Sequence, residues 1–370
     1  MSAWVLVLGA LAVAAANGAN DNFKGVATIF GSRTASYRTS LIWATLTTLA
    51  GGLAATVLGA RLAAAFSGGG LLPPELVGLP TLLMGVAIST ALTVGLAARI
   101  GIPISTTHAI LGALIGAGAM ASAGQLHMSG LAQRFVAPLL LSPILSFALV
   151  AVLYPLLSRL RVAMGVEPTT CVCVATHEEA MAPTRATLAF TAAPAIVHTC
   201  DASSKSTVLG VSARQLVSMA HFLSAGLQSF ARGLNDTPKI AALMFGATLA
   251  GVTLPPTVTF IAVAATMMLG GWFGARRVGE TMSLNITPLN EGQALTTNAI
   301  TASVVLSASV FALPVSMTHV GVGGLIGIGW STGEAHWKMI RTILLSWVVT
   351  LPLAAVLGAL TFAIVARILP

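Results

Sequence analysis

One short polar motif occurs twice in this chain, each time interrupting a long apolar run. Its first copy is GANDNFK at residues 18–24, and its second copy is GLNDTPK at residues 233–239. Glycine, asparagine, aspartate and lysine stand at the same positions in both copies. A motif repeated in this way predicts that the chain is an internal duplication.

A second motif repeats in the same order. PISTTH at residues 103–108 recurs as PVSMTH at residues 314–319. Asp21 precedes Pro103 by 82 residues, and Asp236 precedes Pro314 by 78 residues. The two halves therefore carry the same two motifs at nearly the same spacing, which is expected if each half has the same fold.

The composition places both halves in a membrane. The chain has 370 residues, of which 56% are hydrophobic and 8% charged, with a mean hydropathy of +0.92. Soluble globular proteins carry about 25% charged residues. Long apolar segments with scattered Gly, Pro, Ser and Thr are typical of packed transmembrane helices, whereas barrel strands alternate with period two. The predicted class is an all-α membrane protein.

Several of the apolar segments are short. We expect them at residues 2–16, 39–60, 81–98, 107–123 and 135–157, then at 216–230, 240–250, 257–275, 294–313, 320–330 and 343–366. About 20 residues are needed to cross the hydrocarbon. Short pieces at matching places in two halves indicate broken helices at both Asn-Asp motifs, and re-entrant hairpins with tips at residues 102–107 and 314–318.

The distribution of positive charge predicts an orientation. With the N-terminus outside, eleven Lys and Arg residues near the segment ends lie in the cytoplasm and three lie outside, as the positive-inside rule requires. The net charge of +8 is explained by these residues, so no nucleic-acid partner is expected. The organisation that follows is a first membrane repeat at residues 1–158, a cytoplasmic loop at 159–214 and an inverted second repeat at 215–370, in the inner (plasma) membrane.

Asp21 and Asp236 are the acidic pair at equivalent positions in the apolar segments. A carboxylate at membrane depth is costly unless a cation or hydrogen-bond donors compensate it, so a functional role is the default hypothesis. Together with Asn20, Asn235 and carbonyls freed at helix breaks, the pair offers oxygen ligands that suit an alkali cation. One interpretation is that Asp21 and Asp236 bind sodium, and another is that the same carboxylates carry protons. A third is a structural ion pair with the lysine three residues further on.

The hairpin tips carry hydroxyl groups. Ser105, Thr106 and Thr107 in the first half face Ser316 and Thr318 in the second half of the predicted arrangement. If each tip opens a half-helix, its free N–H groups and positive dipole end point into the same space, which fits a small tetrahedral oxyanion. Hydroxyls that bond back to their own helix are the ordinary alternative.

Other polar residues are expected around the site rather than in it. We assign a supporting or packing role to six residues: Lys24, Lys239, His108, His319, Gln293 and Asn298. The central loop carries Cys171, Cys173, His177, His198 and Cys200, whose spacing matches no strong zinc signature. We therefore expect no cofactor beyond the coupling ion.

The paired G-x-N-D and P-[IV]-S-x-T-H motifs resemble those of the inorganic phosphate transporter (PiT) family. That family includes bacterial phosphate permeases, related sulfate permeases and eukaryotic sodium–phosphate symporters. The resemblance covers both halves and implies an inverted-repeat fold, usually a homodimer, that carries phosphate with sodium or protons. It implies cation coupling at Asp21 and Asp236 and phosphate binding by the motif residues Ser105, Thr106, Thr107, Ser316, Thr318, Asn20 and Asn235.

The chain departs from the family pattern at three places. Many members have small residues and another Asn where this chain has Asn-Phe-Lys at 22–24 and Thr-Pro-Lys at 237–239, and Met317 interrupts the second tip. These departures leave the coupling ion and the anion open, because two lysines would add positive charge near the anion. The predicted function is a phosphate symporter that works by alternating access. The alternatives are a sulfate permease of the same fold, a passive anion channel and a membrane-embedded hydrolase.

Overall fold

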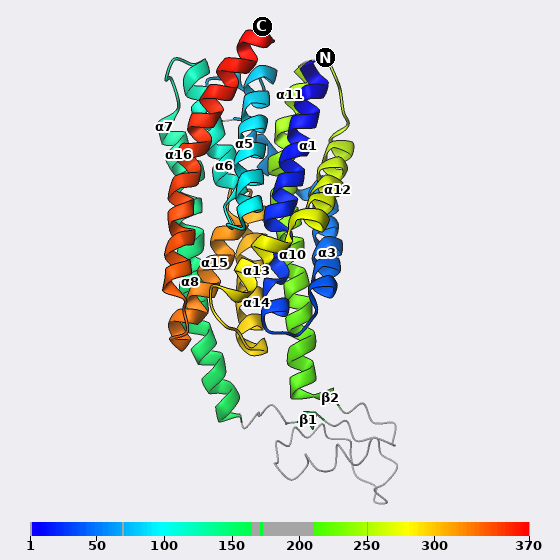
Figure 1. The fold of residues 1–370 in the computed structure, drawn as a ribbon, viewed down its shortest axis with the longest axis vertical. Helices are drawn as coiled ribbons and strands as arrows, with labels where there is room; N and C mark the ends of the chain where they lie inside the picture. Colours follow the sequence, from blue (N-terminus) through cyan, green and yellow to red (C-terminus); the bar gives the residue numbers. More distant parts are fainter. Residues whose placement is uncertain (1, 69, 165–170, 173–210, 250, 370) are drawn as a thin grey trace, which may run out of the picture.

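The computed structural model describes residues 2–68, 70–164, 171–172, 211–249 and 251–369 (Figure 1). Nearly all of them are helical, which confirms the predicted all-α class. The strands in this part of the chain are β1 (Cys171–Val172) and β2 (Val211–Ser212), which pair antiparallel with Cys171 opposite Ser212. The other central-loop residues named above, Cys173, His177, His198 and Cys200, lie outside the described residues.

The described helices fall into two groups, one before β1 and one after β2 in the chain. The first half contains α1 (Ser2–Asp21), the 3₁₀ helix η1 (Lys24–Val26), α2 (Ala27–Gly31), α3 (Tyr37–Leu58), α4 (Ala60–Phe66), η2 (Pro74–Leu76), α5 (Pro80–Ile100), α6 (Thr106–Ala121), α7 (Met128–Leu131), the π-helical turn η3 (Ala132–Val136) and α8 (Ala137–Ala163). The second contains α10 (Ala213–Met244), α11 (Gly246–Leu249), α12 (Pro256–Gly274), α13 (Arg276–Leu284), α14 (Glu291–Val310), α15 (Met317–Thr332) and α16 (Trp337–Ile368).

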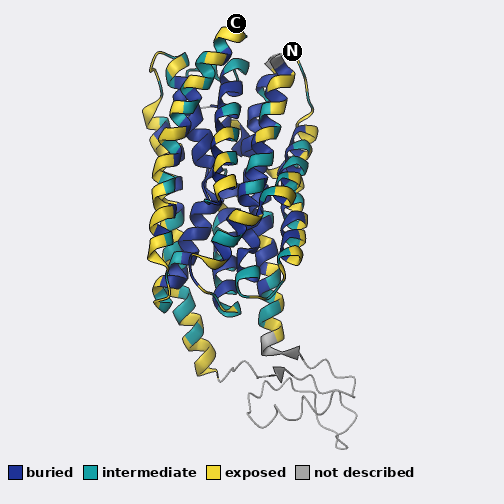
Figure 2. Cartoon of the chain, viewed as in Figure 1, coloured by how far each residue is buried: buried dark blue, intermediate teal, exposed yellow. Residues whose placement is uncertain are grey.

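Six helical stretches among the described residues are long and apolar enough to cross a membrane. They are Ala3–Gly31, Tyr37–Leu58, Pro80–Ile100, Met128–Ala163, Pro256–Gly274 and Trp337–Ile368. The outer helices α8 and α16 expose large apolar side chains, such as Leu140, Ile144 and Val348 (Figure 2). An apolar outer surface of this kind is stable against lipid and not against water, so the chain is a multi-pass membrane protein.

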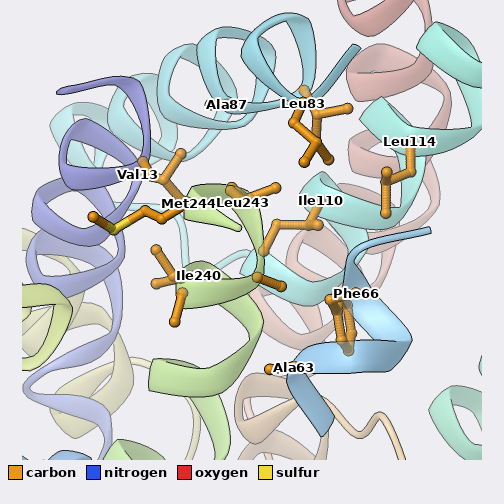
Figure 3. Close-up of a cluster of buried hydrophobic side chains, with 14 of the residues drawn as sticks. Val13, Ala63, Phe66, Leu83, Ala87, Ile110, Leu114, Ile240, Leu243 and Met244 are labelled. Carbon is orange, nitrogen blue, oxygen red and sulfur yellow. The ribbon is translucent and has the colours of Figure 1, made fainter. Parts of the chain in front are cut away.

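Helices α1 and α10 form the centre of the protein and run in opposite directions (Figure 1). Helix α1 packs against α5 and α12, and α10 packs against α3 and α14. The largest apolar cluster lies where α1, α5, α6 and the end of α10 meet, with α4 below them (Figure 3). Val13, Leu83, Ile110, Phe66 and Ile240 belong to this cluster, so the two halves share one core.

The glycine of each repeated motif is a point of close helix contact. A Cβ atom at Gly18 would lie 2.0 Å from the Met267 carbonyl oxygen on α12, and one at Gly233 would lie 2.1 Å from the Thr48 carbonyl oxygen on α3. Neither position has room for a side chain, because the obstacle is backbone. The motif glycines thus set the distance at which α1 packs on α12 and α10 packs on α3.

The helix break predicted at the first motif is present, and the one predicted at the second motif is wrong. Helix α1 ends at Asp21, and the chain turns through Asn22 and Phe23 into η1. Helix α10, in contrast, continues through the whole second motif, so the predicted segment 216–230 and residues 240–244 of the next one lie in one helix. No carbonyls are freed by a break at Asn235.

The second motif also contains Pro238, a residue that usually ends or kinks a helix. Proline removes one backbone donor from a helix, yet membrane proteins tolerate it where neighbouring helices hold the segment. Every residue from 231 to 244 is buried, so α10 is held on all sides at this point. The helix is interrupted only at Phe245, whose N–H donates to the Ala242 carbonyl at 3.2 Å.

Candidate functional site

The two predicted tips are chain turns with the same local structure. Helix α5 ends at Gly101, which has a left-handed φ of 79°, and residues 102–105 are non-helical before α6. Helix α14 is followed by a similar turn before α15. Ser105 caps α6 by accepting from the His108 N–H at 3.1 Å, and Ser316 caps α15 by accepting from the His319 N–H at 3.3 Å. Both predicted serines therefore act as helix N-caps.

The tips contact each other. The Thr318 hydroxyl, in the first turn of α15, donates to the Ile104 carbonyl of the other tip at 2.9 Å. The Thr107 hydroxyl, in the first turn of α6, donates to the Val315 carbonyl at 3.3 Å. Each hairpin thus supplies one carbonyl and one hydroxyl to the contact, and the N-termini of α6 and α15 meet there.

Lys24, the first residue of η1, reaches into this contact from just after the end of α1. Its Nζ lies 2.5 Å from Asp21 Oδ1, 2.7 Å from Asn20 Oδ1, 2.9 Å from the Ile104 carbonyl oxygen and 2.7 Å from Thr318 Oγ1. The side chain is 2% exposed. A buried ammonium is stable only with several oxygen partners, and Lys24 has four of them.

Lys239 makes the equivalent contacts from α10. Its Nζ lies 3.3 Å from Asp236 Oδ1, 2.9 Å from Thr107 Oγ1 and 2.7 Å from the Val315 carbonyl oxygen. The ion pair between each aspartate and the lysine three residues on, one of the three readings from sequence, is therefore present in both halves. The lysines, expected to support the site, lie inside it.

The second oxygens of the two aspartates share one partner, Asn17. Its Nδ2 lies 3.0 Å from Asp21 Oδ2, 3.3 Å from Asp236 Oδ2 and 3.0 Å from Thr106 Oγ1. Thr106 in turn donates to Asp21 Oδ2 at 3.3 Å. Because one amide group reaches both carboxylates, the two motifs lie against each other at the centre of the protein.

Arg232 is the charged residue that the sequence interpretation missed. It is fully buried, and its guanidinium donates to Asn17 Oδ1 at 2.6 Å, to Asn22 Oδ1 at 3.2 Å and to Thr48 Oγ1 at 3.3 Å. Its Nε lies 3.8 Å from Asp236 Oδ2. Asn17 and Arg232 occupy equivalent positions, each directly before a motif glycine. An arginine directly before a motif glycine, between two apolar segments, was the signal that could have revealed it.

The motif asparagines attach the tips to the central helices. Asn20 Nδ2 donates to the Ile102 carbonyl at 3.1 Å, and Asn235 Nδ2 donates to the Val315 carbonyl at 3.3 Å. Asn235 Oδ1 also accepts from Ser309 on α14 at 3.3 Å. These bonds hold both hairpins against α1 and α10, beside the two carboxylates.

The two histidines face away from the tip contact. Their rings lie 4.3 Å apart, and His319 packs on Trp347 of α16 at 3.8 Å between ring centres. Both histidines line an apolar cavity of about 610 Å³ between α8 and α16. The walls of this cavity suit hydrocarbon rather than an oxyanion, so the histidines pack behind the tips.

Gln293 and Asn298 lie elsewhere on α14. Gln293 forms a capping box with Asn290 at the start of that helix, at the opposite end from the tip. Asn298 donates to Thr28 Oγ1 at 2.8 Å, a hydroxyl that also contacts His221 Nε2 at 3.0 Å. Among the described residues no group of three or more His, Cys, Asp or Glu side chains is placed to hold a metal ion.

Comparison with known proteins agrees with the motif resemblance. The sequence profile of the phosphate transporter family matches residues 17–358, which span both motifs in both halves. The chain belongs to the phosphate transporter family. Its members are transporters and not enzymes, so the hydrolase alternative is excluded.

Individual relatives match along nearly the whole chain. A probable low-affinity inorganic phosphate transporter of Mycobacterium bovis is 26% identical over 371 residues, covering 98% of this chain and 77% of the relative. A putative phosphate permease of Thermococcus kodakarensis is 26% identical and covers 98% of both chains. A solved structure described as the sodium-dependent phosphate transporter superposes with a TM-score of 0.79 at 20% identity over 100% of both chains, which shows that the fold is shared.

Proposed function

We propose that this protein is a secondary active transporter that imports inorganic phosphate, coupled to sodium or protons, by alternating access. The observation that carries the proposal is the meeting of two helix N-termini, two threonine hydroxyls and two buried lysines at the tip contact. Free N–H groups at helix N-termini bind anions, and ammonium groups form charge-assisted bonds with phosphate oxygens. The matching family model and the relatives are described as phosphate transporters or permeases, which supports phosphate as the anion.

The tip contact contains hydrogen-bond donors that could transfer to an anion. The donors at the contact now bond to its own two carbonyls. Thr318 and Lys24 donate to the Ile104 carbonyl, and Thr107 and Lys239 donate to the Val315 carbonyl. Phosphate between the tips would take over these donors and separate the carbonyls. Opening toward one side and then the other would follow if the α5–α6 and α14–α15 hairpins rock in turn around the bound anion.

We further infer that residues 1–158 and 215–370 are inverted repeats joined by a cytoplasmic loop at 159–214. Three observations support this: α1 and α10 run in opposite directions (Figure 1), each motif glycine contacts the long helix after the other motif, and the lysine contacts correspond pair by pair. We place the N-terminus outside the inner membrane, as the distribution of positive charge predicts, and expect a homodimer, as the family resemblance implies.

Uptake by the purified protein in liposomes tests the function. Radiolabelled phosphate should accumulate above its external concentration when an inward sodium or proton gradient is imposed, and protein-free liposomes are the control. Excess sulfate should leave uptake intact, since a site built for phosphate can accept the hydrogen bond that only a protonated phosphate donates. Uptake that never exceeds equilibrium would indicate a channel, and loss of uptake to sulfate would indicate a sulfate permease.

A further inference from the structure

The positions expected to hold sodium are filled by the protein itself. Lys24 Nζ is surrounded by a carboxylate, an amide, a carbonyl and a hydroxyl oxygen, all between 2.5 and 2.9 Å away. Such a set of hard oxygen ligands is what an alkali cation takes at a half-helix end in a transporter. Here the ammonium group already uses all four oxygens, so sodium could bind only by displacing it.

The second half repeats the arrangement. Lys239 Nζ has a carboxylate, a hydroxyl and a carbonyl oxygen between 2.7 and 3.3 Å away. Each ammonium joins a carbonyl of one hairpin tip to a threonine of the other, so both lie on the path where the tips meet. Because the two lysines occupy equivalent positions in both halves, the chance formation of two separate ion pairs does not explain their placement.

The charge of the buried cluster points the same way. Among the described residues the buried charged side chains are Asp21, Asp236, Lys24, Lys239 and Arg232. Three cations against two carboxylates leave one positive charge before any ion is added. Sodium at either aspartate would add like charge beside an ammonium at short range, which is unfavourable in a medium of low dielectric constant. An anion, in contrast, would neutralise the cluster.

We propose that Lys24 and Lys239 are tethered counter-cations that take the place of a coupling sodium, so that phosphate binds without sodium. The proposal rests on the proposed function, because it names the cation at the same site. Phosphate binds directly to the two ammonium groups and to the hydroxyls of Thr107 and Thr318. Removing an ammonium group leaves an oxygen cage, and that cage accepts sodium.

The wild-type protein alone gives the first test. Purified full-length protein is titrated calorimetrically with inorganic phosphate in choline chloride and in sodium chloride at equal ionic strength. The dissociation constants are expected to agree within about twofold. Phosphate binding at least about tenfold tighter in sodium would overturn the proposal. The absence of phosphate binding in both media would refute the proposed function itself, so the two failures are distinguishable.

A Lys24→Ala variant gives the second test. Loss of a charge-assisted partner should weaken phosphate binding in choline about tenfold or more, and sodium should restore part of it. Lys338→Ala, which removes an exposed lysine, is the matched control and should bind like the wild type in both media. A folded Lys24→Ala protein that binds phosphate no more tightly in sodium than in choline contradicts the proposal. If the variant does not fold, the wild-type comparison decides.

Discussion

The contact between Arg232 and Asn17 should contribute strongly to the stability of the folded protein. Its donor and acceptor atoms are 2.6 Å apart, both residues are fully buried, and the donor is charged. Hydrogen bonds to charged groups contribute ~1.5–3 kcal/mol. A double-mutant cycle of Arg232→Met, Asn17→Ala and the combined variant should therefore give a coupling free energy of ~1.5–3 kcal/mol. The single Arg232→Met change should cost more, ~3–5 kcal/mol, because it also leaves Asp236 with one cation fewer.

Unfolding of the purified variants by SDS in mixed micelles measures these free energies. The six tryptophans of the chain supply the fluorescence signal. The same cycle on Arg276 and Glu280, an exposed pair at 2.9 Å, is the control. Its coupling should be much smaller, because solvent and salt screen exposed ion pairs. A coupling between Arg232 and Asn17 no larger than that of the exposed pair would refute the view that this contact joins the two halves.

Three further predictions concern the motif glycines, the capping box of α14 and the two aspartates. Gly18→Ala and Gly233→Ala should abolish accumulation of folded protein in a size-exclusion assay, because the new methyl group meets backbone at 2.0 or 2.1 Å. Gly292→Ala, whose Cβ would have its nearest contact at 3.5 Å, is the control and should be tolerated. Gln293→Ala should lower the free energy of unfolding by ~1 kcal/mol through loss of the capping box and leave phosphate affinity unchanged in calorimetry. Asp21→Asn and Asp236→Asn should abolish gradient-driven phosphate uptake into liposomes while the proteins remain folded; unchanged uptake by both would contradict a coupling role.

Much of the architecture was readable from the repeated motifs. Two copies of PxSxTH predicted two turns, and the structure has them, with Ser105 and Ser316 as caps. The prediction was correct because proline and a capping serine act on the backbone next to them, whatever the distant parts of the chain do. Local reasoning failed at the second Asn-Asp motif, where a break was predicted, since burial on all sides lets α10 continue through Asn235 and Pro238.

The partners within the site could not be read in the same way. Asn17 and Arg232 bond across 215 residues, and only the packing of α1 against α10 brings them together. Lys24 and Lys239 were visible in the motifs, but their role depends on which carbonyls lie at the tips of the opposite hairpins. Gln293 and Asn298 are polar residues near the start of the second hairpin that were expected around the site, yet α14 places Gln293 at the end away from the tip. Sequence spacing identifies which residues are polar and paired, and tertiary packing decides which of them meet.

The most direct test of the account is phosphate binding by proteins that lack the tip hydroxyls. Thr107→Val and Thr318→Val keep the side-chain shape and remove the donors now bonded to Val315 and Ile104, and Thr342→Val on α16, an exposed position, is the control. The account predicts that each tip variant binds inorganic phosphate about tenfold more weakly in calorimetry, since each loses a hydrogen bond to a charged ligand, while the control is unchanged. Wild-type affinity in both tip variants would contradict the claim that phosphate is held between the two hairpins.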